Sequence, residues 1–161
     1  KKAQTLFEKI ELNFMKDKIF HSYDKNIVFL EDYAYLINTL LDLFNLTLNI
    51  KYKLKAKELC SETIQYFYRK DKNIFQKNKI QSNDIFFNPI DISDHTISNG
   101  NSIMLRNLSR LGFVSEAKKL NESLNGYLNI YKNYMVSSLK SIDLFNEILL
   151  KKNCNEEGCE I

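Results

Sequence analysis

One stretch of the sequence decides the fold: residues 29–44, which read FLEDYAYLINTLLDLF. It predicts a helix from about Glu31 to Leu48 that is apolar nearly all the way round. Such a helix must be covered on every side, as an inner helix of a double-walled helical barrel is. Glu31, Asp32 and Tyr33 open the helix, so its first turn can project polar groups into a central cavity. The two carboxylates also lie at the positive end of the helix dipole.

The composition fits one helical domain. The chain has 161 residues, of which 44% are hydrophobic and 12% aromatic, with only 4 Gly and 1 Pro. This excludes disorder and disfavours a turn-rich β architecture. The net charge of +3 is spread along the chain, unlike the clustered charge of a nucleic-acid-binding protein. Lys51, Lys53, Lys55 and Lys57 alternate with apolar residues and are interpreted as a solvated helix face.

The apolar runs, the N-terminal sequence and the number of cysteines bear on the cellular location of the protein. No apolar run approaches the roughly 18 residues of a membrane span, and no signal peptide is visible. Three cysteines do not make the disulfide framework of a small secreted domain. We therefore expect a cytoplasmic protein without a membrane or nucleic-acid partner. The chain begins with Lys1 rather than Met, which is typical of a fragment or a processed piece.

Amphipathic and apolar helices alternate along the chain. Amphipathic helices are expected at residues 3–15, 52–69 and 115–131, a second apolar helix at 101–111, and a last helix at about 134–145. Gly112 is the expected C-cap of the second apolar helix. Strand-like connections are expected at residues 19–23, 73–76 and 85–87. We predict an all-α fold, a partial (α/α)6 toroid of about three hairpins over residues 1–150, with outer amphipathic and inner apolar helices. A flexible tail is expected at residues 151–161.

Three segments carry a resemblance to a known family: IFHSY at 19–23, LEDYAY at 30–35 and DHTISNGNS at 94–102. Together they resemble the helical C-terminal part of an uncharacterised thioredoxin-domain-containing family that includes the spermatogenesis-associated thioredoxin-like protein. That family joins a thioredoxin-like domain to a six-hairpin, glycosidase-like barrel. The resemblance covers roughly residues 1–150. It implies that this chain is about half of the barrel, without the thioredoxin-like domain and the first hairpins.

The third segment both keeps and departs from the family pattern of Asp, a few small residues and Pro-Ser-Gly-Asn-Ser. The residues that are kept are Asp94, Gly100, Asn101 and Ser102. Ser98 and Asn99 stand where Pro and Ser are usual, and His95 replaces a small residue, so no family role passes to His95. The barrel is similar to sugar 2-epimerases and unsaturated-glycan hydrolases. The resemblance therefore implies a carbohydrate-binding, sugar-isomerising or sugar-hydrolysing role within a larger thioredoxin-like protein, although fold alone does not fix function.

Two acidic helix openings supply the candidate catalytic residues, Asp32 and Asp94. In a toroid both can face one end of the cavity, where carboxylates bind sugar hydroxyls or move protons. The residues expected to bind substrate around them are Tyr23, Glu31, Tyr33, His95 and Asn101. Each carboxylate also has a simpler interpretation as a helix cap that accepts backbone N–H bonds. The simpler interpretation of His95 is a loop histidine bonded to Asp94 or Asp91.

No cofactor or metal motif is present in the sequence. Cys154 and Cys159 are interpreted as exposed thiols of the tail, because zinc sites need a second pair or nearby histidines. Cys60 is interpreted as a small hydrophobe on a packed helix face. The alternative function is a non-catalytic helical scaffold that binds a thioredoxin-like domain or chain. Self-association is expected under either interpretation, because a truncated toroid must cover its inner helices.

Overall fold

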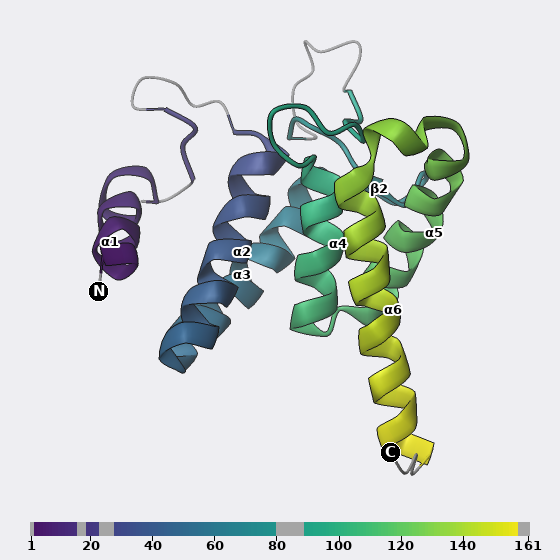
Figure 1. Ribbon diagram of the computed structural model, residues 1–161. Coiled ribbons are helices and arrows are strands. Elements are labelled where there is room, and N and C mark those ends of the chain that lie inside the picture. The colour runs from purple at the N-terminus through teal and green to yellow at the C-terminus, as the bar shows by residue number, and fades with distance from the viewer. Residues whose placement is uncertain (1, 16–18, 23–27, 80–88, 158–161) are drawn as a thin grey trace. The chain divides into compact units, whose positions relative to one another are not determined.

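The computed structural model describes residues 2–15, 19–22, 28–79 and 89–157, with side chains as far as Lys151. The described residues form an all-α fold (Figure 1). Its helices are α1 (Lys2–Phe14), α2 (Leu30–Thr47), α3 (Ile50–Phe67), α4 (Gly100–Leu111), α5 (Val114–Tyr131), the short 3-10 helix η1 (Lys132–Tyr134) and α6 (Val136–Glu157). Two short strands, β1 (Tyr68–Arg69) and β2 (Ile74–Phe75), pair with each other.

The chain forms two compact units. The first comprises Lys1–Arg69 and Phe75–Ile90, and so contains α1, α2 and α3. The second comprises Lys70–Ile74 and Asp91–Ile161, and contains α4, α5, η1 and α6. Each unit is built around one tight helical hairpin.

In the first unit, α2 and α3 run side by side and are joined by two residues (Figure 1). Leu48 takes the left-handed conformation, with φ of 55°, and its N–H donates to Phe44 O at 2.7 Å. Asn49 caps α3, because its side chain accepts from Lys51 N at 3.1 Å. The left-handed region is unfavourable for a branched residue such as Leu. The hydrogen bonds on both sides of Leu48 therefore hold the turn in place.

The burial of α2 only partly matches the prediction of a helix covered all round. Its buried residues are Leu30, Tyr33, Ala34, Leu36, Ile37, Leu40, Leu41 and Leu43. Thr39, Asp42 and Asn45 are exposed and follow one another at three-residue steps, which places them on one side of a helix. The prediction of complete coverage was therefore wrong: α2 has a wide apolar face and a narrow polar strip.

The second hairpin closes through glycine. Gly112 has φ of 79° and its N–H donates to carbonyls of the last turn of α4, and Phe113 N donates to Leu108 O at 3.0 Å. This is the expected C-cap, and glycine takes the left-handed conformation without the penalty of a Cβ atom. The predicted ends of α4 and α5 are confirmed to within one residue.

Helix α4 forms the centre of the second unit. Nine of its 12 residues are buried, and it packs against both α5 and α6. Met104, Leu105 and Leu108 have no exposed surface, and burying each such side chain contributes about 1.5–3 kcal/mol. By contrast, α5 buries only Ala117, Leu120 and Leu124 among its 18 residues. The predicted alternation of a covered helix and an amphipathic one is therefore present in this unit.

The last helix is longer than predicted. We expected it to end near Phe145, but α6 continues to Glu157. The backbone of residues 151–157 is thus helical, and the flexibility expected of the tail stays a prediction. Within the described residues, none of these helices combines the length and the apolar character needed to cross a membrane.

Candidate functional site

Asp32 lies in the first turn of α2 and uses its two carboxylate oxygens differently. Oδ2 accepts a hydrogen bond from the backbone N–H of Phe29 at 2.9 Å. This bond satisfies one backbone donor just before the helix, as the acidic residue of a capping box does. The N-cap residue Phe29 has no side-chain acceptor, so only this return half of the box can form. The capping role anticipated for Asp32 is therefore present, but it occupies only one oxygen.

The other oxygen of Asp32 faces a histidine. Oδ1 lies 2.8 Å from Nδ1 of His21, which comes from the segment before α2. The His21 side chain is 52% exposed and that of Asp32 19%, and the imidazole also packs edge-on against the Phe29 ring, with centroids 4.9 Å apart. A carboxylate bonded to Nδ1 fixes the ring and leaves Nε2 to meet a ligand or a proton.

A pocket of about 220 Å³ lies beside this pair. Its lining residues are Ile10, Phe14, Met15, Ile19, Phe20, His21, Asp32 and Leu36. The wall is thus mostly aliphatic and aromatic, with polar groups supplied by His21 and Asp32. A concave apolar surface with a few convergent polar groups is the usual form of a small-molecule site.

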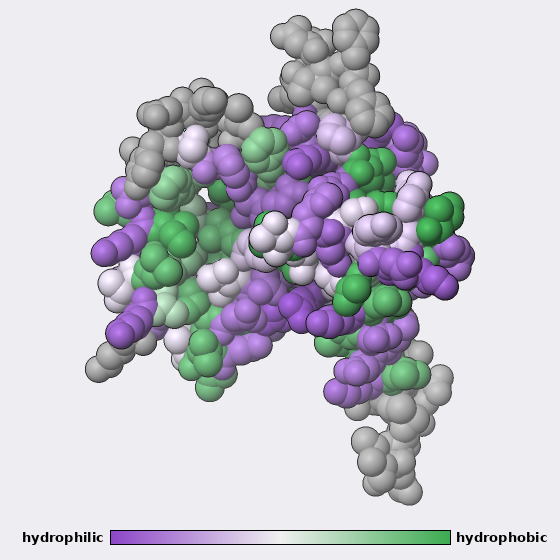
Figure 2. Space-filling model, turned by 45° about the horizontal axis from the view of Figure 1, so that its top comes forward, coloured by the Kyte–Doolittle hydropathy of each residue, from purple (hydrophilic) through white to green (hydrophobic). Residues whose placement is uncertain are grey.

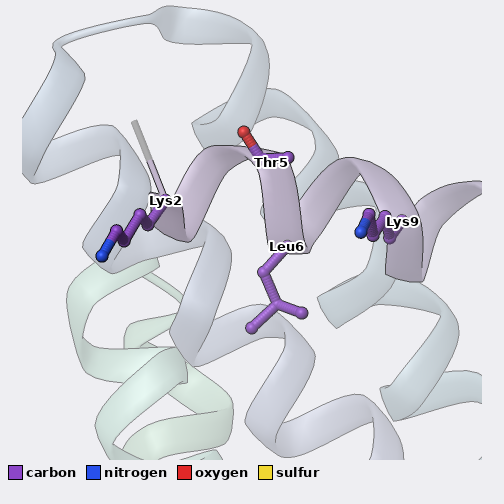
Figure 3. A pocket seen from close by; sticks show the side chains of 4 residues that line it. All are labelled: Lys2, Thr5, Leu6 and Lys9. Carbon is purple, nitrogen blue, oxygen red and sulfur yellow. The ribbon is translucent and has the colours of Figure 1, made fainter.

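A second hollow, of about 320 Å³, lies along α1 (Figure 3). Figure 3 shows the side chains of Lys2 and Lys9 on either side of Leu6, with Thr5 on the same helix. Leu6 is 61% exposed, and all four described lining residues come from one helix. The hollow is larger but brings together no groups from different elements, so the pocket beside His21 is the better candidate.

The other predicted residues of the first unit have different surroundings. Tyr33 is buried, and its ring packs against Phe67 with centroids 5.5 Å apart. Burial, reinforced by the neighbouring Glu62 carboxylate, raises the pKa of the Tyr33 phenol well above its ordinary range. A buried, neutral phenol of this kind belongs to the core. Glu31 is half-buried in the first turn of α2, and Tyr23 lies outside the described residues.

Asp94, in the second unit, is the centre of a hydrogen-bonded cluster that we call the Asp94 clasp (Asp94, Asn99 and Ser137). Oδ1 accepts from the backbone N–H of Asn99 at 3.0 Å, from its side-chain amide at 2.9 Å and from the Ser137 hydroxyl. Oδ2 accepts from Ser137 N at 2.7 Å. Asn99 is the N-cap of α4, and Ser137 lies in the first turn of α6. Asp94 therefore ties together the N-termini of two helices.

The protonation of Asp94 follows from these bonds. Burial raises the pKa of its carboxyl, but the hydrogen bonds donated by Ser137 and Asn99 favour the charged form more strongly. The pKa is consequently held below its ordinary value. A negative charge at two helix N-termini is also favoured by both helix dipoles. Both oxygens are engaged within the protein, which is the arrangement of a structural carboxylate.

His95 and Asn101 flank this clasp without joining it. The His95 side chain is 74% exposed, with Nε2 3.9 Å from Asp91 Oδ1. His95 is thus a loop histidine near Asp91, but this separation is too long for the expected hydrogen bond. Asn101 is completely buried, and its amide donates to Asp91 O at 2.9 Å. It thereby holds the loop that leads into α4.

The predicted site residues thus fall into two groups, one in each unit. Asp32 and its neighbours belong to the first unit and Asp94 and its neighbours to the second, and their convergence on one cavity stays a prediction. Cys60 is completely buried, as expected. The side chains of Cys154 and Cys159 lie outside the described part of the chain. Among the described side chains, no group of three His, Cys, Asp or Glu residues is placed to hold a metal ion.

His21 is the site residue that the sequence did not single out. It precedes Asp32 by 11 positions, and no helical or strand spacing relates two residues across a loop of that length. Its only signal in the sequence was that it belongs to the short segment 19–23, which carries the family resemblance.

In comparisons with known proteins, the sequence matches no family model and no curated protein.

Proposed function

We propose that this chain is a carbohydrate-binding domain of the six-hairpin glycosidase-like type, and that the pocket beside His21 and Asp32 receives a small sugar. The observation that carries the proposal is the 2.8 Å contact between Asp32 Oδ1 and His21 Nδ1 at a mostly apolar pocket. A sugar presents apolar C–H faces together with hydroxyl groups. Phe14 and Phe20 offer surfaces for the first, and the His–Asp pair offers partners for the second.

The pair also has the chemistry for proton transfer. With Nδ1 held by Asp32, Nε2 of His21 can hydrogen bond to a hydroxyl, or take up and return a proton during isomerisation or glycosidic cleavage. The pocket volume of about 220 Å³ lies below the roughly 300–1,000 Å³ of sites for drug-sized ligands. A ligand of monosaccharide size is therefore the class that we propose.

The toroid and the family belong to this proposal. The contrast between α4, with nine of 12 residues buried, and α5, with three of 18, supports alternating inner and outer helices. The segments 19–23, 30–35 and 94–102 support membership of the thioredoxin-domain-containing family. We propose that this domain works with a thioredoxin-like domain or chain in the cytoplasm.

The proposal is tested by titrating monosaccharides into the isotope-labelled protein and following amide chemical shifts. Sugars are expected to shift the resonances of the lining residues, which are Ile10, Phe14, Met15, Ile19, Phe20, His21, Asp32 and Leu36. Asp32→Asn keeps an oxygen that can accept from the Phe29 N–H but disturbs the bond to His21. We expect it to weaken sugar binding about tenfold, because a charge-assisted hydrogen bond is lost. Asp143→Asn, at an exposed position on α6, is the matched control. Unchanged sugar binding by Asp32→Asn would count against the proposal.

A second candidate function is the non-catalytic scaffold, and one surface of the second unit favours it. Large apolar side chains are exposed around η1: Ile130 (73%), Tyr131 (44%), Tyr134 (64%), Val136 (52%) and Leu139 (44%). Aromatic residues are enriched in protein–protein interfaces. If this surface binds a second copy, Tyr134→Glu is expected to convert a dimer into a monomer in light scattering after size exclusion. If the wild-type protein is monomeric at every concentration, the hypothesis that this surface binds a second copy is wrong.

A further inference from the structure

The turn between α2 and α3 exposes four large aliphatic side chains. Leu46, Leu48, Ile50 and Leu54 are 79%, 78%, 56% and 61% exposed, and we call them the hairpin tip. Two hydrogen bonds fix the turn. The Leu48 N–H donates to Phe44 O at the end of α2, and the Asn49 side chain accepts from the Lys51 N–H at the start of α3. The aliphatic side chains are therefore presented by an ordered turn between two packed helices. Figure 2 shows hydrophobic side chains reaching the surface in separate patches among hydrophilic ones.

Positive charge adjoins the hairpin tip. Lys51 and Lys53 are exposed in the first turn of α3. The ammonium group of Lys53 lies 5.3 Å from the centre of the Phe44 ring at the end of α2, so its charge is held at the tip. The sequence has no acidic residue between Asp42 and Glu58. The exposed aliphatic residues are therefore accompanied by cations that no carboxylate in this segment offsets.

We propose that the hairpin tip docks on the surface of an anionic lipid bilayer. The aliphatic side chains would enter the boundary between headgroups and acyl chains, and the lysines would contact headgroup phosphates. Membrane binding of surface segments strengthens with buried apolar area and with attraction to anionic lipids. Lysine suits this role, because its long stem stays beside apolar groups while its charge remains in the headgroup region.

The composition of the tip favours a bilayer over a protein partner. Its exposed residues are Leu, Ile and Lys. Protein interfaces are enriched in aromatic residues, Met and Arg and depleted in Lys, and Leu is under-represented in their hot spots. Basic residues near an anionic leaflet, by contrast, are attracted to it. The surface around η1 differs from the tip in that it contains two exposed tyrosines, Tyr131 and Tyr134.

This proposal departs from the expectation of no membrane partner, which rested on the lack of an apolar run long enough to span a bilayer. Docking on the bilayer surface needs no membrane-spanning helix. The cytoplasmic leaflet carries anionic lipids, so the proposed location of the protein in the cytoplasm and the proposed docking agree. The exposure of Lys51, Lys53 and Lys57 agrees with the interpretation of a solvated helix face, and the proposal gives Lys51 and Lys53 a specific role on that face. The docking proposal is independent of the sugar site, because it uses none of the pocket residues.

The test is co-sedimentation of the full chain with lipid vesicles. Vesicles of phosphatidylcholine with about one-third phosphatidylglycerol supply the anionic surface, and pure phosphatidylcholine vesicles are the neutral control. We expect partitioning to be about tenfold stronger on the anionic vesicles. Raising the salt concentration is expected to reduce the difference, because salt screens the lysine charges.

Variants separate the two contributions. Leu46→Gln with Leu48→Asn removes apolar area at exposed positions, and Asn is tolerated in the left-handed conformation. Lys51→Gln with Lys53→Gln removes the charges. Each double variant is expected to lower anionic-vesicle partitioning about tenfold. The matched controls, Ile97→Gln with Leu150→Gln and Lys118→Gln with Lys119→Gln, change exposed residues of the second unit and are expected to bind as the wild type does.

Three results would overturn the proposal. The first is the absence of binding to anionic vesicles. The second is equal loss in the tip variants and their controls, which would show non-specific adsorption. In the third, the Leu46→Gln, Leu48→Asn variant changes the oligomeric state, whereas the Lys51→Gln, Lys53→Gln variant binds anionic vesicles as the wild type does; the tip is then an interface between copies of this chain.

Discussion

Asp32 and Asp94 both lie where a helix begins, but their surroundings differ. Asp94 gives both oxygens to Asn99 and Ser137 and so ties α4 to α6. Asp32 gives one oxygen to the Phe29 N–H and the other to an exposed histidine beside a pocket. The comparison teaches that the partner of the second oxygen decides whether a carboxylate at a helix N-terminus has a structural or a functional role. Where other residues of the fold donate hydrogen bonds to both oxygens, the role is structural.

The largest expected effect is the loss of the Asp94 clasp. Asp94→Ala removes the carboxylate that accepts from Ser137 and Asn99, and we expect it to lower the free energy of unfolding by about 3 kcal/mol. Urea denaturation measures the change, with Asp143→Ala, at an exposed position on α6, as the control. A loss no greater than that of the control would mean that the clasp is not a structural element.

The pH dependence of stability should show the same clasp. Because the folded-state pKa of Asp94 is lowered, below an unfolded-state value of about 3.9, its carboxylate stabilises the fold fully above that pH. This contribution is lost as the pH falls through the folded-state pKa. The difference in stability between wild type and Asp94→Asn should therefore shrink below about pH 4. A difference that is constant from neutral to acidic pH would contradict the assignment.

Asp32→Ala should cost less than Asp94→Ala, which sharpens the comparison. It removes one backbone cap, for which the expected loss is about 1 kcal/mol, and an exposed contact with His21. Thermal unfolding followed by circular dichroism measures the loss. If Asp32→Ala destabilised the protein as much as Asp94→Ala, both carboxylates would be structural and the proposed sugar site would lose its main support.

His21→Gln should have the smallest effect on stability. The imidazole is half-exposed, and exposed ionic contacts contribute little, so we expect a change below about 0.5 kcal/mol. Sugar-induced chemical shifts should nevertheless be lost. His95→Gln, which changes the other exposed histidine of the described chain, is the control for that binding measurement. A His21→Gln protein that is strongly destabilised would place His21 among the structural residues.

The fold was predictable where local signals agree. Gly112 marks the end of α4, and Ala117, Leu120 and Leu124 recur at helical spacing on α5, as the structure confirms. The end of α6 was placed too early: Ile148 and Leu149 still follow Phe145 at helical spacing, and the helix continues beyond them to Glu157. Periodicity reports burial of a face, and a helix can extend beyond the part of it that is buried.

The site was less predictable, because it depends on contacts across loops. Asp32 and Asp94 have the same sequence signature, an acid near a helix start, and only the positions of His21 and Ser137 separate them. Ser137 follows Asp94 by 43 residues, and no local pattern encodes a contact at that distance. The exposure of Leu48 also escaped prediction, since it depends on the left-handed turn that a leucine rarely occupies.

The span of the Asp94 clasp has a consequence for the order of folding. The α4–α5 hairpin closes across Gly112 and Phe113 through neighbours in the chain, so it can form early, whereas the clasp must wait until α6 has returned to α4. Interactions that form after the transition state change the rate of unfolding and leave the rate of folding almost unaltered. In stopped-flow experiments we therefore expect Asp94→Ala to raise the unfolding rate and to leave the folding rate almost unchanged. The slopes of both arms of the chevron plot should stay the same. The clasp would then act as a latch that sets the lifetime of the folded second unit.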